Sequence, residues 1–256
     1  MFATAGDYDD EESTVAPPRV WPDVLTPESP RAIIVESSLV HNLLPLIIHF
    51  AAVLGPSWGI MLFILKENWI EPQSPAFQRL KASGHIEVRF LPAGTSLADS
   101  KSVSTFLTSS WIWEQVLQAH RVLLFQTDSI ICSKSETAVE DYFEYDFVGA
   151  PISPVYGQGY NGGLSIRNPR LFWHIVQETD FATSAQQFED QFFYNELQKR
   201  GAALPDQMVA KTFAVETIYY ETPLGYHQPQ RWQPAHLESI VDWCPEVTML
   251  IGRRAH

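Results

Sequence analysis

Long apolar runs are missing from this sequence of 256 residues, and with them the pattern of a membrane-spanning helix. The most apolar stretch, residues 43–54, is interrupted by Pro45 and His49, and it is shorter than the roughly 20 residues that a helical span needs. Residues 1–14 are acidic and have no apolar core like that of a secretory signal. We therefore expect no membrane span and, because no targeting signal is visible, a cytoplasmic location.

Basic residues are also scarce. Lys and Arg number 17 against 30 Asp and Glu, and the net charge is −13. No stripe of Lys and Arg is present that could neutralise a phosphate backbone, which excludes a nucleic-acid partner. An anionic ligand would instead need a metal ion or a few local cations.

Cysteine is the third scarcity, with two residues in the chain. Cys132 and Cys244 lie far apart and form no CxxC pattern. This spacing predicts buried or free thiols rather than a disulfide framework or a zinc site.

The composition that is present belongs to a globular protein, with 45% hydrophobic and 18% charged residues. Residues 1–30 differ from the rest, because they hold five prolines and the run DYDDEE, and about half of the net charge lies there. Such a segment cannot bury enough apolar surface to offset its ordering entropy. We predict a disordered or loosely attached arm over 1–30 and a single domain over 31–256.

Apolar runs alternate with helical patterns in the first half of the domain. Buried strands are predicted at 31–37, 58–66, 85–91 and 122–125. Helices are predicted at 42–54, 75–83 and within 102–119. This order predicts an α/β fold with a mainly parallel sheet and helices on both of its faces.

The second half of the domain is more irregular. Strands are predicted at 147–151, 164–167 and 214–220. Helices are predicted at 169–177 and 190–199, a glycine-rich loop at 155–163, and a polar aromatic segment at 225–232.

Asp128 is the first candidate site residue, because it follows the predicted strand at 122–125 after Gln126 and Thr127. Ligands of open α/β sheets bind beyond the carboxyl ends of the strands. A carboxylate there can hold a divalent ion, which neutralises a diphosphate. The alternative is that Asp128 caps the following turn.

The segment 161–167 is the second candidate. Gly162 and Gly163 allow positive φ and a close approach of the backbone to a polar ligand. Ser165 and Arg167 alternate with apolar residues and therefore share one face of a strand. A plain hairpin loop is the alternative.

Two further candidates lie near the end of the chain. Glu189 and Asp190 open an apolar helix, where acids are favoured by the helix dipole, or where Asp190 could act as a general base on an acceptor hydroxyl. His227 lies in a segment bounded by Gly and Pro. It is either a surface residue or a second ligand for a metal or a phosphate.

Six segments recur in the order and spacing of a known family. They are FQTD (125–128), YDFVGAP (145–151), GYNGGLSIR (159–167), EDQFF (189–193), FAVE (213–216) and YHQP (226–229). The chain resembles, over roughly 31–232, an uncharacterised family of glycosyltransferase-like proteins of fungi and other eukaryotes. That family is similar to GT-A glycosyltransferases, whose Rossmann-like half binds a nucleotide sugar. The resemblance implies a GT-A-like fold.

The resemblance also implies a donor site. Asp128 matches the remaining carboxylate of the DXD motif, which holds Mn²⁺ or Mg²⁺ against the donor diphosphate, while Gln126 replaces the first acid and Thr127 lies between them. His227 resembles the C-terminal metal-binding histidine. The residues that close the first strand would hold the base and the ribose; they are Glu36, Ser37 and Ser38.

The catalytic roles implied by the resemblance are those of an inverting enzyme. Residues 188–190 resemble the xED motif, with Asp190 as the base and Glu189 beside it. The sugar and acceptor side would be lined by Asn161, Gly162, Gly163 and Arg167. The implied donor is a UDP- or GDP-linked sugar, and the implied acceptor is a hydroxyl, with a small metabolite favoured.

Two other hypotheses remain open at the level of sequence. Gln126 in place of an acid favours a catalytically weak relative that binds a nucleotide sugar or a glycan without transferring it. The acidic arm favours an α/β interaction module that recruits a partner.

Overall fold

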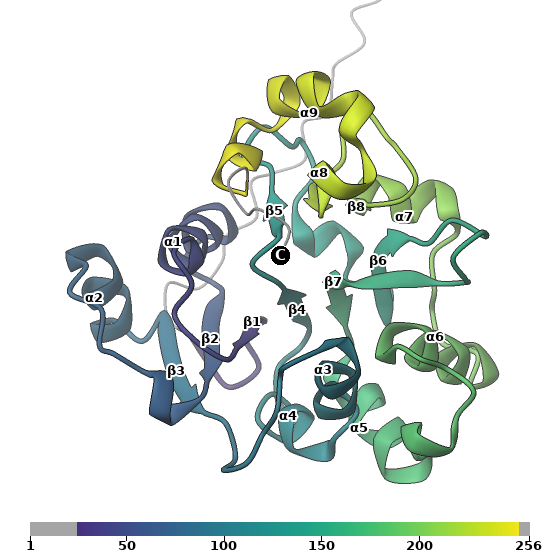
Figure 1. The fold of residues 1–256 in the computed structure, drawn as a ribbon, viewed down its shortest axis with the longest axis horizontal. Helices are drawn as coiled ribbons and strands as arrows, with labels where there is room; N and C mark the ends of the chain where they lie inside the picture. The colour runs from purple at the N-terminus through teal and green to yellow at the C-terminus, as the bar shows by residue number, and fades with distance from the viewer. Residues whose placement is uncertain (1–24, 251–256) are drawn as a thin grey trace, which may run out of the picture.

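A computed structural model describes residues 25–250 of the chain (Figure 1). Residues 1–24 of the predicted arm lie outside the described residues. Residues 25–30 contain a turn, in which the Ser29 N–H donates to the Thr26 carbonyl at 3.1 Å. The Glu28 carbonyl accepts from the His120 N–H at 2.9 Å, which attaches this segment to the domain.

The main sheet has six strands in the order β3-β2-β1-β4-β7-β6. Their bounds are β1 Arg31–Glu36, β2 Gly59–Ile64, β3 Ile86–Phe90, β4 Val122–Phe125, β6 Phe147–Pro151 and β7 Tyr160–Arg167. Strands β1 to β4 are parallel, and β7 runs antiparallel to both β4 and β6. All six residues of β2 are buried, as in a parallel strand covered on both faces. The predicted α/β class with a mostly parallel sheet is confirmed.

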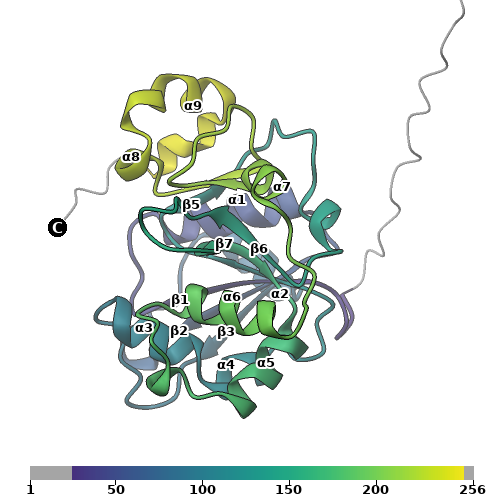
Figure 2. The same cartoon turned by 90° about the vertical axis from the view of Figure 1, so that its right-hand side faces the viewer.

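Helices cover both faces of this sheet (Figure 2). One face carries α1 (Leu43–Leu54) and α7 (Gln207–Phe213); the other carries α3 (Ser100–Leu107), α4 (Ser110–Glu114), α5 (Pro169–Glu178) and α6 (Glu189–Lys199). Beside β3 lies α2 (Pro75–Ala82). The Ser74 side chain caps α2, and Gly84 just beyond it has φ 79°, which confirms the predicted ends of this helix.

A second, three-stranded sheet has the order β5-β9-β8. Its strands are β5 (Ser129–Ile131), β8 (Ala214–Val215) and β9 (Gly225–His227), followed by α8 (Pro229–Trp232) and α9 (Leu237–Trp243). The register places Ser129 opposite His227. This small sheet therefore brings the segment after β4 next to a segment about a hundred residues later in the chain.

The structure departs from the sequence prediction in three elements. The helical pattern within 102–119 divides into α3 and α4. The strand predicted at 214–220 ends at Val215. The glycine-rich loop predicted at 155–163 ends sooner, because β7 begins at Tyr160 and pairs with both β4 and β6. Asn161, Gly162 and Gly163 therefore lie in a strand.

The two cysteines form a disulfide, and the prediction of free thiols is wrong. Cys132 follows β5 and Cys244 follows α9, with their Cα atoms 5.0 Å apart. Contacts between β5 and the turn at 245–249 bring these positions together, which spacing along the chain could not show. Structural disulfides are rare in cytosolic proteins, so this bond does not favour the cytoplasmic location, which stays a prediction. Between residues 25 and 250, no helix is long and apolar enough to cross a bilayer.

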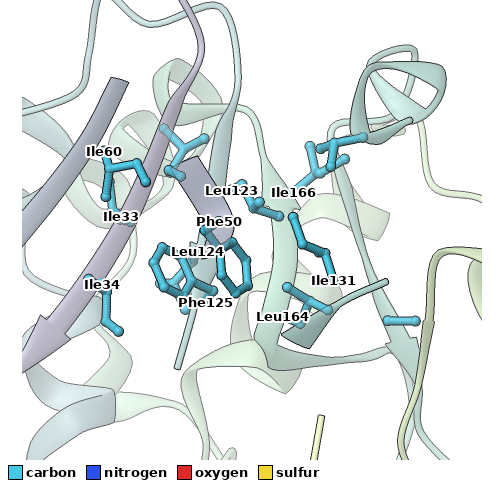
Figure 3. Packing of buried hydrophobic residues seen from close by; sticks show 14 of the residues in the cluster. Ile33, Ile34, Phe50, Ile60, Leu123, Leu124, Phe125, Ile131, Leu164 and Ile166 are labelled. Atoms are coloured by element: carbon cyan, nitrogen blue, oxygen red, sulfur yellow. The ribbon is translucent and has the colours of Figure 1, made fainter. Parts of the chain in front are cut away.

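The buried core between α1 and the sheet fixes the end of β4 (Figure 3). Phe50 of α1 stacks on Phe125, the last residue of β4, with ring centroids 3.9 Å apart. Leu164 of β7 pairs with Phe125 in the sheet. Burial of one such ring contributes about 1.5–3 kcal/mol, so the point at which Gln126 leaves the sheet is firmly held.

Candidate active site

A cavity of about 410 Å³ opens beyond the carboxyl end of β4. It lies between β7, the start of α6, and the segment formed by β9 and α8. Seven residues singled out in the sequence line it: Gln126, Asn161, Gly162, Gly163, Glu189, Asp190 and His227. The structure therefore collects candidates from four separate segments in one place.

His227 is the centre of a charged cluster on one side of the cavity. Its Nδ1 lies 3.0 Å from Oε1 of Glu216, which follows β8. Its Nε2 lies 3.4 Å from Oδ1 of Asp128 and 3.2 Å from Oε1 of Gln126. Asp128 and His227 are thus neighbours, as the donor-site hypothesis requires.

The surroundings of His227 favour its charged form. Burial disfavours the imidazolium, but hydrogen bonds with Asp128 and Glu216 outweigh this effect and raise the pKa of His227 to about 9. At neutral pH the cluster therefore holds a cation between two carboxylates. Glu216 was not singled out as a site residue, although the FAVE segment contained it.

Asp128 lies at the margin of the cavity and does not line it. Its side chain is 25% exposed, and its Oδ2 accepts from Nε2 of Gln228 at 2.9 Å. Gln228 adopts a left-handed conformation with φ 47°, which turns the chain from β9 into α8. Thr127 is buried, and its carbonyl accepts from Nδ2 of Asn42 at 2.9 Å.

Glu189 and Asp190 open α6 on the opposite side of the cavity, and both are buried. Oδ2 of Asp190 accepts from the Gly162 N–H at 3.0 Å, and Oδ1 accepts from the Gln191 N–H at 2.7 Å. Burial, together with the charge of Glu189, raises the pKa of Asp190 to about 7. A carboxyl group that titrates near neutrality is suited to general-base chemistry at physiological pH.

Arg167 does not contact the cavity, contrary to the sequence prediction of a sugar or acceptor contact. Its side chain is fully buried beneath the cavity floor. Nη2 donates to Oε1 of Glu189 at 3.0 Å and to the Gly162 carbonyl at 3.2 Å, and Nε donates to Oγ of Ser165 at 2.9 Å. Three rings surround the guanidinium at 5.4–5.8 Å: those of Trp113, Phe147 and Phe172.

The two glycines of β7 serve close packing rather than the positive φ that the sequence suggested. A Cβ atom on Gly163 would overlap the imidazole of His227. A Cβ atom on Gly162 would lie 2.5 Å from Nη2 of Arg167 and 2.6 Å from Oε1 of Glu189. The Asn161 side chain accepts from the Gly163 N–H at 2.7 Å. Backbone and side chains thus meet at distances that only glycine allows.

Glu36, Ser37 and Ser38 lie outside this cavity. Glu36 is the last residue of β1, and Ser37 and Ser38 follow it. Because β1 neighbours β4, these residues share the carboxyl edge of the sheet. The Ser37 carbonyl accepts from Nδ2 of Asn68 at 2.7 Å. Their role in holding the base and the ribose stays a prediction.

Aromatic residues that were not singled out form one rim of the cavity. Tyr156 is 58% exposed and contacts Trp232 edge-on at 5.0 Å. Arg231 lies 4.7 Å above the ring of Trp232. The signals in the sequence were a tyrosine within the glycine-rich segment and the pair Arg-Trp five residues after Tyr226.

Comparison with known families gives one match. Residues 85–227, more than half of the chain, match the family model described as "Protein of unknown function (DUF5672)". The match spans β3 to β9 and includes the cavity residues from Gln126 to His227. No match was found among curated proteins.

Solved structures with a similar arrangement include two glycosyltransferases. The apo form of GlyE from Streptococcus pneumoniae TIGR4 has 13% identity and a TM-score of 0.49, covering 78% of this chain and 54% of that chain. Mannosyltransferase PcManGT from Pyrobaculum calidifontis, in complex with GDP-Man and Mn²⁺, has 10% identity and a TM-score of 0.42, covering 74% and 59%. This chain spans little more than half the length of these proteins.

Proposed function

The chain belongs to the DUF5672 family, and we propose that it is a glycosyltransferase that moves a sugar from a UDP- or GDP-linked donor to an acceptor hydroxyl. One observation supports this proposal above the others. A single cavity joins Asp190, whose pKa is about 7, to the cluster of His227, Asp128 and Gln126 at the end of β4. Glycosyl transfer requires a base for the acceptor and a group that manages charge on the leaving diphosphate.

The donor set around His227 fits a divalent ion that shares its coordination with a diphosphate. Nδ1 of His227 bonds to Glu216, the arrangement that commonly orients a metal-ligating imidazole through its other nitrogen. After Nε2 of His227 releases its proton, His227 and Asp128 would hold Mn²⁺ or Mg²⁺, which would offset the negative charge of the diphosphate. Within residues 25–250, no three His, Cys, Asp or Glu side chains form a metal cage, so diphosphate oxygens would supply further ligands.

Asp190 is the proposed base. The Gly162 N–H holds one carboxylate oxygen, which orients the side chain at the cavity surface. The acceptor hydroxyl gives its proton to Asp190, and its oxygen forms a bond to the anomeric carbon. The bond from that carbon to the diphosphate breaks, and the diphosphate leaves with the electron pair. This displacement inverts the anomeric centre.

Gln126 favours a second candidate function, that of a protein that binds a nucleotide sugar without transferring it. An amide oxygen can approach His227, as it does at 3.2 Å, but it brings no negative charge to hold a metal ion. Binding of nucleotide sugar with no transfer or hydrolysis would support this reading.

Calorimetry with UDP and GDP, each with and without Mn²⁺, tests the donor site. The proposal predicts binding that Mn²⁺ strengthens and that Asp128→Ala removes, together with donor hydrolysis. Asp242→Asn, at an exposed acid outside the cavity, is the matched control and should leave both unchanged. Absence of binding under both conditions would overturn the proposal, and metal-independent binding without hydrolysis would favour the second candidate.

Measurements of transfer test the base. Asp190→Asn should retain donor binding and lose transfer by on the order of a hundred-fold or more, because proton transfer by a positioned base typically contributes that much. Full activity of this variant would reject Asp190 as the base.

A further inference from the structure

Arg167 is a buried cation whose contacts are directed at the acid pair. Its Nη2 lies 3.0 Å from Oε1 of Glu189, and its guanidinium lies among three aromatic rings. For Nη1, no hydrogen-bond partner is present among the described residues. A buried charge is tolerated when it is paired, and Glu189 is the carboxylate that this arginine pairs with.

Glu189 is fixed on both of its oxygens. Oε1 accepts from Arg167, and Oε2 lies 3.5 Å from Oγ of Ser104 in α3. Its own N–H donates to the same Ser104 oxygen at 3.3 Å. These contacts occupy the side chain, so Glu189 is poorly placed to take a proton from a substrate.

Asp190 has a different environment, although it is the next residue. Its carboxylate accepts only backbone N–H groups in the described contacts, from Gly162 and Gln191. Gly162 connects the two acids, because its carbonyl accepts from Nη2 of Arg167 while its N–H donates to Asp190. Arg167 thereby holds the peptide unit that orients Asp190.

We propose that Arg167 is a positioning residue that divides the acid pair: it neutralises and fixes Glu189, and it leaves Asp190 as the group that accepts the acceptor's proton. This inference rests on the proposed transferase function. The charged groups that face Asp190 are Glu189 from its own helix and Arg167 from β7. The other charged residues that line the cavity are Glu216 after β8, His227 of β9 and Arg231 of α8; α3 contributes hydroxyl groups of serine.

The test compares the titration of Asp190 in the wild type and four variants. The titration is measured by NMR of the carboxyl carbon and by the acid limb of the pH profile of transfer. Glu189→Gln removes the negative neighbour and leaves the cation. Asp190 should therefore titrate at a lower pH in this variant than in the wild type, and transfer should be lowered but not abolished. Arg167→Met should move the titration upward, because the cation is lost while Glu189 remains.

Arg167→Met leaves Glu189 buried without its partner, so this variant can fail to fold. The double variant Arg167→Met with Glu189→Gln avoids this problem, because it removes both charges together. Its Asp190 should titrate between the values of the wild type and of Glu189→Gln. In Arg167→Lys, the acid limb of the pH profile should lie between those of Arg167→Met and the wild type. Lysine returns the positive charge but not the double contact of one guanidinium nitrogen with Glu189 and Gly162.

Two results would overturn the inference. Loss of transfer at every pH in Glu189→Gln, with donor binding retained, would make Glu189 the base. An Asp190 titration that is equal in all folded variants, with only the rate lowered, would give Arg167 a purely structural role. The NMR titration does not depend on activity. A wild-type protein with no transfer or hydrolysis would therefore refute the proposed function, while the order of the Asp190 titrations would still decide the role of Arg167.

Discussion

Replacement of Asp190 by Asn should stabilise the protein above neutral pH while it removes transfer. The folded protein raises the pKa of Asp190 from 3.8 to about 7, because the side chain is buried beside Glu189. A shift of about 3 units corresponds to about 4 kcal/mol between the two protonation states. The folded state therefore holds a proton that the unfolded chain releases, and the ionised group disfavours folding at high pH.

The sign of the pH dependence follows from proton binding. Between about pH 4 and pH 7 the folded state binds more protons at this site than the unfolded state, so the free energy of unfolding falls as pH rises. Above about pH 7 the loss is complete. Asn removes this pH-dependent contribution. Its amide group, however, meets the Gln191 N–H, which in the wild type donates to Oδ1 of Asp190 at 2.7 Å. That mismatch costs about 1 kcal/mol or more, so we expect a net gain of about 2–3 kcal/mol at pH 8.

Urea unfolding at pH 5 and pH 8 measures this effect. The difference between Asp190→Asn and the wild type should grow in favour of the variant by about 2–3 kcal/mol between these two pH values, since the other groups of the chain cancel. Asp242→Asn is the control, and its difference should be the same at both pH values. A difference for Asp190→Asn that does not change with pH would refute the assigned burial and protonation of Asp190.

Three further predictions concern the charged cluster, the packing of β7 and the disulfide. Hydrogen bonds raise the pKa of His227 to about 9. The stability that His227 contributes to the metal-free protein is therefore complete below about pH 6.5 and is lost as pH rises through about 9, and the loss is about 3 kcal/mol. Denaturation below and above this range should show the loss in the wild type and not in His227→Gln. Gly163→Ala should abolish Mn²⁺-dependent binding of nucleoside diphosphate in calorimetry, because the added Cβ overlaps the His227 imidazole; binding equal to that of the wild type would contradict this packing. Cys132→Ser should lower the free energy of unfolding by about 2–4 kcal/mol. A reducing agent should lower the free energy of unfolding of the wild type by the same amount and should not change that of the variant. Equal sensitivity of both proteins to the reducing agent would argue against the bond between Cys132 and Cys244.

The strands of the main sheet were predictable because of how they are buried. A parallel strand that is covered on both faces has a continuous apolar sequence, and the sequences of β2 and β4 show this pattern. The strand predicted at 214–220 was too long, because β8 ends at Val215. The next residue, Glu216, contacts His227 through its side chain. Local pattern identifies the strand but not the contact that ends it.

The candidate site was predictable in its residues more than in their roles. Position at a strand end or a helix start identified Gln126, Asp190 and their neighbours, since these positions follow from local pattern. The environment of Arg167 could not be read from the sequence, because alternation along a strand says which residues share a face and not which face is buried. The bond between Cys132 and Cys244 was missed for a similar reason, since it depends on the contact of β5 with the turn at 245–249.

A crystal structure of the protein with Mn²⁺ and UDP or GDP would show where a donor diphosphate binds. We expect the diphosphate beside Asp128 and His227, with the nucleoside toward residues 36–38 and open space in front of Asp190. A diphosphate bound at any other edge of the molecule, with the cavity between His227 and Asp190 empty, would contradict it.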